Sequence, residues 1–296
     1  MSTRDAPHPL RSGIMLIANF GDVHGNLSGV DELTSRWEAS RMRTVGAVFL
    51  AKDVGMFHDP HQVDRATRSH GNKDETNYLA AKYVAGEFEM SHKVYFCRGN
   101  HEDPAPLRKQ MNQAVDPKGK LVYWAGGSIH QLVDGGTRVR ILTVGGIHPS
   151  SWTDPFTDPK GRRTAPERYF DSEELRAVDA VHSDAADILL THGGPVGLAH
   201  AHKPDAGSPF LLQLIERIQP RFHFFGHYGS PPSPVRVGRT WMVPLNRPTA
   251  VRVPLRDGGM GILDTQTWKF EFGLDANHAT ESREERGALQ GAVLES

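Results

Sequence analysis

A carboxylate and an imidazole, Asp22 and His24, stand two positions apart and a few residues after an apolar run at residues 14–18. The run has the length of a buried strand and is too short to cross a membrane. Gly21 and Gly25 flank the pair and permit a turn of the backbone. Such a turn at a strand end aims both side chains into one crevice, where they suit a divalent metal ion. Asp-x-His pairs are common on surfaces, so this interpretation depends on the rest of the chain.

The same arrangement recurs after four more apolar runs, at residues 45–51, 94–98, 188–191 and 222–225. The side chains that follow these runs are Asp53, Asn100 with His101, His192 and His227. A single histidine is more often a hydrogen-bonded core or surface residue than a ligand. Open α/β sheets, however, place their sites at the carboxyl ends of strands. We therefore expect the five strand ends to bring these side chains together.

In this order, the stretches resemble the motifs of the calcineurin-like metallophosphoesterase superfamily. The matching stretches are 21–26 (GDVHGN), 49–53 (FLAKD), 98–102 (RGNHE), 189–194 (LLTHGG) and 225–229 (FGHYG). The first and third are specific as a pair, whereas the single-histidine motifs are weak without them. The resemblance spans about residues 14 to 265. It implies an α/β fold, a four-layer sandwich of two mixed β-sheets flanked by helices.

The resemblance also implies a centre of two divalent metal ions. The implied ligands are Asp22 and His24 for the first metal, Asp53 as the bridge, and Asn100, His192 and His227 for the second metal. His101 would contact the substrate and protonate the leaving oxygen. Two such ions neutralise a phosphate and make hydroxide available at neutral pH, so the implied reaction is hydrolysis of a phosphate ester. Ligands of these types without thiolates favour Mn²⁺, with Fe or Zn as alternatives.

Two positions depart from the family pattern near the metals. Gly229 stands where many members have a second histidine that reaches the first metal. We expect weaker binding of that metal, although the serine/threonine phosphoprotein phosphatase branch also has one histidine there. Met56 replaces a second aspartate that orients the catalytic histidine, and Phe57 replaces the phosphate-holding arginine of that branch. The chain therefore differs from a standard phosphoprotein phosphatase.

Another carboxylate has to take the place of the missing aspartate if His101 is to be oriented. The candidates close to the motifs are Glu102, Asp59 and Asp103. The sequence does not choose among them. Arg98, which precedes the Gly-Asn-His-Glu stretch, is interpreted as a structural partner rather than a phosphate ligand.

Composition limits the classes of function and the compartment. The 296 residues carry a formal net charge of −1, which argues against a wide basic face for nucleic acid. The single cysteine, Cys97, lies in an apolar strand and excludes an internal disulfide, as is typical of a reducing compartment. The chain has no apolar run of transmembrane length, and the first one ends in the Asp22 motif, so we expect no signal peptide and a cytoplasmic protein without membrane contact.

The predicted organisation is a lead-in at 1–13, one domain at 14–273 and a disordered tail at 274–296. Apolar periodicity predicts helices at 27–42, 74–90, 170–181 and 209–218, and a short helix after Pro104. A turn at residues 134–136 predicts a hairpin between the strands at 128–133 and 137–144. Further strands are expected at 121–124, 239–245, 250–255, 259–263 and 268–272.

A long proline-rich and basic loop spans residues 148–170. Loops of this length are uncommon unless they are functional or disordered. We expect this one to contact an anionic substrate through Arg162, Arg163 and Arg168.

Three functions remain open. A metal-dependent phosphoesterase acting on a small phosphorylated molecule or nucleotide suits the pI of about 7.0. A nuclease or RNA phosphodiesterase would use the arginines as a basic lip and Trp152 and Phe156 for stacking. In its favour, residues 99–170 resemble RNA lariat-debranching enzymes, which also lack the second aspartate but keep the final histidine. A non-catalytic metal-binding scaffold is the third, although the chain retains His101. The substrate, the preference for monoester or diester and the oligomeric state stay open.

Overall fold

The computed structural model describes residues 15–51, 53–59, 61, 63–64, 79–134, 136–148, 168–228, 233–246, 259–273 and 293–296. The predicted lead-in, the strand predicted at 250–255 and most of the predicted substrate loop and tail lie outside these residues. Most of the predicted 14–273 domain lies within them.

The first sheet has seven strands in the order β13-β12-β11-β1-β2-β3-β4. Its parallel half consists of β1 (Leu16–Phe20), β2 (Ala47–Leu50), β3 (Val94–Phe96) and β4 (Leu121–Tyr123). Its antiparallel half consists of β11 (Met260–Asp264), β12 (Lys269–Phe272) and β13 (Leu294–Glu295). The sheet is mixed, and the carboxyl ends of β1, β2 and β3 share one edge.

The second sheet has six strands in the order β5-β6-β7-β8-β10-β9. These are β5 (Ile129–Asp134), β6 (Thr137–Val144), β7 (Ile188–Thr191), β8 (Phe222–Phe225), β10 (Thr240–Pro244) and β9 (Val235–Val237). The inner four are parallel, and β5 and β9 pair antiparallel at the two edges. Asp134 pairs with Thr137, which confirms the predicted hairpin.

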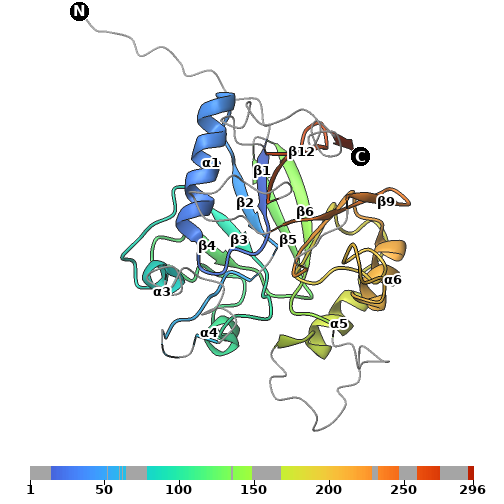
Figure 1. Cartoon of the computed structure of the whole chain (residues 1–296), viewed down its shortest axis with the longest axis horizontal. Helices are drawn as coiled ribbons and strands as arrows, with labels where there is room; N and C mark the ends of the chain where they lie inside the picture. Colours follow the sequence, from blue (N-terminus) through green and yellow to red (C-terminus); the bar gives the residue numbers. More distant parts are fainter. Residues whose placement is uncertain are drawn as a thin grey trace, which may run out of the picture.

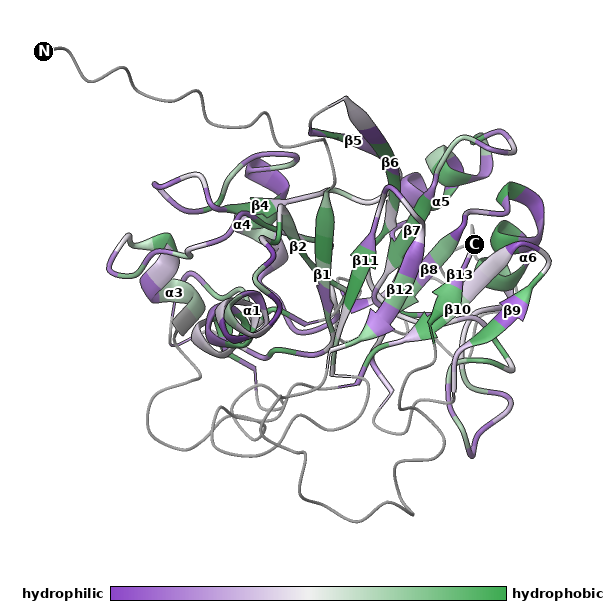
Figure 2. Cartoon of the chain, turned by 90° about the horizontal axis from the view of Figure 1, so that it is seen from above, coloured by the Kyte–Doolittle hydropathy of each residue, from purple (hydrophilic) through white to green (hydrophobic). Residues whose placement is uncertain are grey.

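Helices cover the outer face of each sheet. On the first sheet lie α1 (Leu27–Arg41), α3 (Leu79–Val84) and α4 (Pro104–Lys109), and on the second lie α5 (Ser172–Asp179) and α6 (Pro209–Ile218) (Figures 1 and 2). Three separate apolar clusters fill the spaces between helices and first sheet, between the two sheets, and between second sheet and helices. The predicted four-layer sandwich is therefore confirmed.

Helix α1 begins directly after the last residue of the first motif. The Asn26 side chain accepts a hydrogen bond from the Gly29 amide at 3.1 Å and so caps the helix. Val30, Leu33 and Trp37 form its buried face, as the apolar spacing predicts. Met42 adopts a left-handed conformation and ends it. The metal motif is thus held between a buried strand and a capped helix.

The structure differs from the sequence prediction at several ends. Strand β1 lies two residues further along than the predicted apolar run, because Asn19 is fully buried inside it and bonds through its amide nitrogen to the Ile17 carbonyl at 3.0 Å. Of the helix predicted at 74–90, the described part is helical over Leu79–Val84. Strands β9 and β13 were not predicted, since the three residues of β9 are largely exposed and β13 has two residues, so neither forms an apolar run. Leu294 of β13 is buried against β12, inside the predicted tail.

Cys97 is fully buried at the end of β3, and burial raises the pKa of its thiol far above the usual range. This agrees with an inert core residue. In the part of the chain that the structure describes, every helix is too short or too polar to span a bilayer.

Candidate metal centre

The two sheets pack face to face, and the predicted ligands lie at five strand ends. In chain order, the side chains follow β1 (Asp22 and His24), β2 (Asp53), β3 (Asn100), β7 (His192) and β8 (His227). The first three strands are neighbours in one sheet, and the last two are neighbours in the other. All six predicted ligands are therefore brought to one place.

The first ligand group consists of Asp22, His24 and Asp53, each with a potential ligand atom within 4.8 Å of the others. The backbone of His24 has φ 42°, an uncommon conformation for a residue with a side chain. Its amide donates to the Asp53 carbonyl at 2.8 Å, and the next amide, of Gly25, donates to the Val54 carbonyl at 2.7 Å. These bonds join the two turns and hold the strained residue in place.

The second group consists of Asp53, His192 and His227, again within 4.8 Å. Nε2 of His192 lies 2.6 Å from Asn100 Oδ1, 3.1 Å from His227 Nδ1 and 3.6 Å from Asp53 Oδ1. The His227 backbone, like that of His24, has a positive φ, 71°. Four nitrogen and oxygen donors thus converge on one point, and Asp53 belongs to both groups.

The electrostatics of the site favour a bound cation. The pKa of Asp53 is raised well above its usual value, first by burial and then by the nearby charges of Glu102 and Asp22. Burial also raises the pKa of Glu102, whose Oε1 accepts a hydrogen bond from the Val54 amide at 2.7 Å. Buried carboxylates that repel one another are costly unless a cation compensates them. The donor set and its charge therefore fit a pair of divalent metal ions.

Gly99 is required for the Asp53 carboxylate to occupy its position. Asp53 Oδ1 accepts hydrogen bonds from the amides of Asn100 at 2.7 Å and His101 at 2.9 Å. A Cβ atom on Gly99 would lie 2.1 Å from the same oxygen. Gly99 of the third motif thus leaves the space that the Asp53 carboxylate of the second motif occupies.

A buried network supports the turn that carries His192. The Thr191 hydroxyl donates to the Gly193 carbonyl at 2.6 Å and therefore accepts from Nε2 of His223 at 2.7 Å. His223 is fully buried in β8, and burial lowers its pKa to about 3. The Gly226 amide also donates to the His192 carbonyl at 3.0 Å. His223 was not predicted from the sequence, because a histidine inside an apolar strand gives no signal of its contacts.

We expect His223 to make the fold sensitive to acid. Its pKa is about 3 when folded and about 6.5 when unfolded. Between these values the unfolded chain binds the extra proton, so stability falls as the pH falls, by about 1.4 kcal/mol per pH unit. Urea denaturation of metal-free protein between pH 7 and 4 measures this slope, and a His223→Gln variant, which keeps a donor for Thr191, should lose that share of it.

The control is His182→Gln, which changes an exposed histidine after α5. That variant should keep the slope of the unaltered protein. Equal slopes for His223→Gln and the unaltered protein would contradict the prediction.

The carboxylate beside His101 is Asp64, a residue that was not predicted from the sequence. Asp64 Oδ2 bonds to Nδ1 of His101, and Arg168 Nη2 donates to the same oxygen at 3.1 Å. Asp64 lies well beyond the second motif in a polar stretch, so no motif spacing identifies it.

The three carboxylates suggested from the sequence have other hydrogen-bond partners. Asp59 accepts from the His61 amide at 2.8 Å, and Asp103 caps α4 by accepting from the Ala105 amide at 3.2 Å. Glu102 accepts from the Val54 amide, as described above. The expectation that one of these three lies against His101 is wrong, because Asp64, a side chain from a more distant part of the chain, makes the hydrogen bond to His101.

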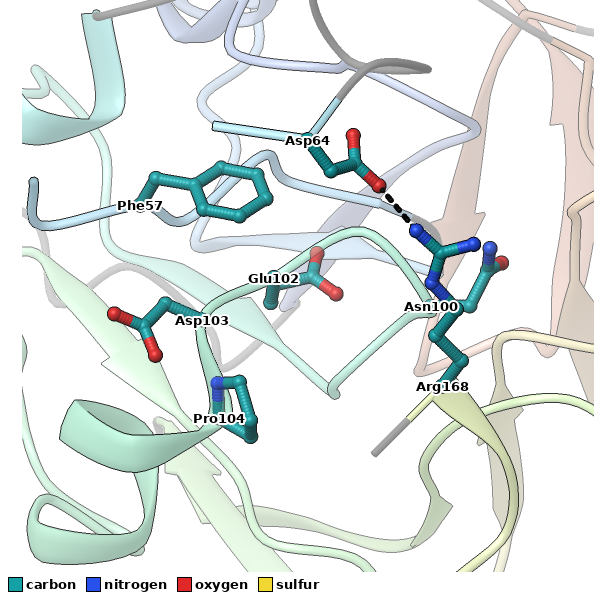
Figure 3. Close-up of a pocket in the computed structure, with 7 residues that line it drawn as sticks. All are labelled: Phe57, Asp64, Asn100, Glu102, Asp103, Pro104 and Arg168. Atoms are coloured by element: carbon teal, nitrogen blue, oxygen red, sulfur yellow. Dashed lines mark hydrogen bonds and ion pairs between the residues drawn. The ribbon is translucent and has the colours of Figure 1, made fainter. Parts of the chain in front are cut away.

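The predicted substrate arginines are described only in part. Arg162, Arg163 and the departure at Gly229 lie outside the described residues. Arg168 lines a cavity of about 180 Å³ together with Phe57, Asp64, Asn100, Glu102, Asp103 and Pro104 (Figure 3). Arg98 donates through Nη2 to the Tyr169 carbonyl at 3.1 Å, in agreement with a structural role.

Comparison with known families agrees with this geometry. The family model described as calcineurin-like phosphoesterase matches residues 15–231, well over half of the chain. The chain belongs to the calcineurin-like phosphoesterases. It is therefore a metallophosphoesterase, a hydrolase of phosphoric ester bonds, in a family that uses a dinuclear metal centre.

Solved structures share the fold of this phosphoesterase. The protein TT1561 of Thermus thermophilus aligns with a TM-score of 0.51 and 15% identity over 88% of this chain and 99% of that chain. A second solved structure aligns with a TM-score of 0.54 and 11% identity over 89% and 100%. Identities this low show the fold alone. No curated protein matches the sequence.

Proposed function

We propose that this phosphoesterase hydrolyses a small phosphorylated molecule or nucleotide with two divalent ions held by the six convergent side chains. The observation that carries the proposal is the membership of Asp53 in both ligand groups. A carboxylate shared by two sets of nitrogen and oxygen donors is the arrangement that a pair of ions requires. The elevated pKa of this buried group supports the same interpretation.

The bound ions, His101 and Asp53 would have different roles in the reaction. When bound, the ions neutralise the phosphate and make hydroxide available at neutral pH. His101 donates a hydrogen bond from its Nδ1–H to Asp64, because a carboxylate oxygen only accepts, and the proton that passes to the oxygen of the leaving group is then the one on Nε2. The Asp53 carboxylate fixes the His101 backbone, because it accepts a hydrogen bond from the His101 amide at 2.9 Å. The acid is thus held next to the site where the phosphate binds.

The cavity beside Asn100 has a volume of about 180 Å³ and is lined mainly by polar and charged side chains, including Asp64 and Arg168. The nuclease hypothesis depends on Arg162, Arg163, Trp152 and Phe156, which lie outside the described residues. It stays a hypothesis, and no described contact favours it.

The test is hydrolysis of p-nitrophenyl phosphate and of bis(p-nitrophenyl) phosphate by metal-stripped protein titrated with Mn²⁺. We expect activity that requires metal and saturates at two ions per chain, counted by elemental analysis. Replacement of His101 by alanine should lower kcat by about 10²- to 10⁴-fold, as loss of a general acid does, while both ions stay bound.

Preference for the diester would favour the phosphodiesterase hypothesis. Two bound ions without turnover would point to a substrate too selective for these probes. One ion or none, without turnover, would contradict the dimetal proposal and favour the scaffold.

Fe²⁺ and Zn²⁺ titrations in parallel test the choice of Mn²⁺, which we propose from the absence of thiolate ligands. We also propose a cytoplasmic location, since a single cysteine allows no disulfide within the chain, as is typical of a reducing compartment.

A further inference from the structure

Arg168 and His101 approach the same carboxylate oxygen from different parts of the fold. Oδ2 of Asp64 accepts from Nδ1 of His101 and from Nη2 of Arg168, the latter at 3.1 Å. The dashed line in Figure 3 marks the arginine contact. A carboxylate with one partner can still rotate about its Cβ–Cγ bond, whereas a second fixed donor sets its orientation. The position of the His101 ring thus depends on where Arg168 is held.

The backbone at Arg168 is firmly held. The Ile147 amide donates to the Arg168 carbonyl at 3.1 Å, and the Phe170 amide donates to the Ile147 carbonyl at 3.1 Å, which forms a short parallel bridge. Gly146 lies against Tyr169 so closely that a Cβ there would be 2.5 Å from the Tyr169 oxygen. The arginine therefore projects from a fixed point.

Arg98 connects this point to the backbone that carries His101. Its guanidinium donates to the Tyr169 carbonyl at 3.1 Å, and its own carbonyl accepts from the Gly146 amide at 2.8 Å. Arg98 is buried and stands three positions before His101. The histidine and Arg168 are thus anchored to backbone segments that Arg98 ties together, with Asp64 bonded to both side chains.

We propose that Asp64 is the positioning residue for His101 and that Arg168 acts on the reaction through Asp64, not by binding the substrate phosphate. The proposal rests on the proposed function, in which His101 protonates the leaving group. It replaces the expectation that Arg168 contacts substrate. The Arg168 side chain is 42% exposed, and its guanidinium is already paired with the Asp64 carboxylate.

The test compares phenyl phosphate with p-nitrophenyl phosphate. The phenol leaving group has a pKa of about 10, like tyrosine, and needs a proton, whereas the nitro group stabilises the phenolate and lessens that need. Asp64→Asn should lower kcat on phenyl phosphate by about 10- to 100-fold, and on p-nitrophenyl phosphate by much less. Arg168→Gln should show the same pattern at a smaller size, about 3- to 10-fold, with KM little changed.

A double-mutant cycle shows whether the effects pass through His101. Asp64→Asn with Arg168→Gln should be no slower than Asp64→Asn alone, and neither change should matter in a His101→Ala background. An exposed arginine on α5, changed in Arg176→Gln, is the matched control for loss of charge. Melting curves and metal counts on each variant exclude unfolding, and Asp64→Ser serves if Asp64→Asn is unstable.

Several outcomes would overturn the proposal. A rise in KM and weaker inhibition by inorganic phosphate in Arg168→Gln, persisting without His101, would show that Arg168 binds phosphate. Equal losses on both esters in Asp64→Asn would show a merely structural role. The proposed function fails separately: in that case His101→Ala itself would not change the dependence on the leaving group.

Discussion

Replacing Asp53 by asparagine should abolish most activity and at the same time stabilise the metal-free protein. Activity is expected to fall by about 100-fold or more, because the bridge between the two ligand groups is lost. Asparagine keeps an oxygen that can accept from the Asn100 and His101 amides, so the turn should survive. It also removes a buried charge whose raised pKa reflects burial and repulsion by Glu102 and Asp22.

The stability gain has a defined dependence on pH. Because the folded pKa of Asp53 is raised, the folded state binds more protons than the unfolded state, and this group destabilises the fold as the pH rises above the unfolded value of about 3.9. Melting curves in EDTA should show Asp53→Asn melting above the unaltered protein at pH 7, with the difference shrinking in acid. Added Mn²⁺ should reverse the order.

The control changes an exposed aspartate, Asp205, to asparagine. It should alter neither activity nor the response to metal. A metal-free Asp53→Asn protein that melts below the unaltered one at neutral pH would contradict the account of a strained, anionic centre.

Gly99→Ala should be the most damaging change outside the ligands themselves. The added methyl would lie 2.1 Å from Asp53 Oδ1, far inside contact distance. Either the Asp53 carboxylate or the turn after β3 must move. This movement would break the hydrogen bonds that the Asn100 and His101 amides donate to Asp53. We expect about 1–3 kcal/mol of lost stability, at most one bound ion and little residual hydrolysis. Elemental analysis and urea denaturation measure both effects.

Gly193→Ala is the matched control, since this glycine is adjacent to His192. A Cβ there would find its nearest neighbour at 3.7 Å, an ordinary contact. This variant should keep its metals and most of its activity. If both variants behaved alike, the steric explanation for Gly99 would be wrong.

The sequence was most informative where an apolar strand ends in a polar residue beside a glycine. Asp22, Asn100 and His192 each stand beside glycines after an apolar run, so the ligand turns could be predicted from local pattern. The four-layer arrangement of the two sheets was implied by the resemblance to the family. The assignment of each ligand to a metal remains a prediction. Asn19 misled the placement of β1, because a fully buried asparagine in a strand resembles a strand end.

Other features depended on long-range contacts that no local pattern encodes. Asp64 bonds to His101 although the two residues are far apart in the sequence. Arg168 donates to the same Asp64 oxygen from more than a hundred positions away. His223 supports the His192 turn from the neighbouring strand. Such partners become visible only when the elements are packed, since neither spacing nor periodicity connects them.

The placement of the centre between two sheets has a consequence for the chain as a polymer. The ligands run from Asp22 to His227, and the single cysteine allows no disulfide within the chain. When the proposed ions bind, they hold together strand ends that lie far apart in the sequence. A disulfide stabilises a fold by restricting the unfolded chain, whereas these ions stabilise the folded chain by mass action, because the assembled site exists only there. A single site at a free metal concentration 100 times its Kd adds about 2.7 kcal/mol to the unfolding free energy. The supply of metal would therefore govern the lifetime of this fold as well as its chemistry.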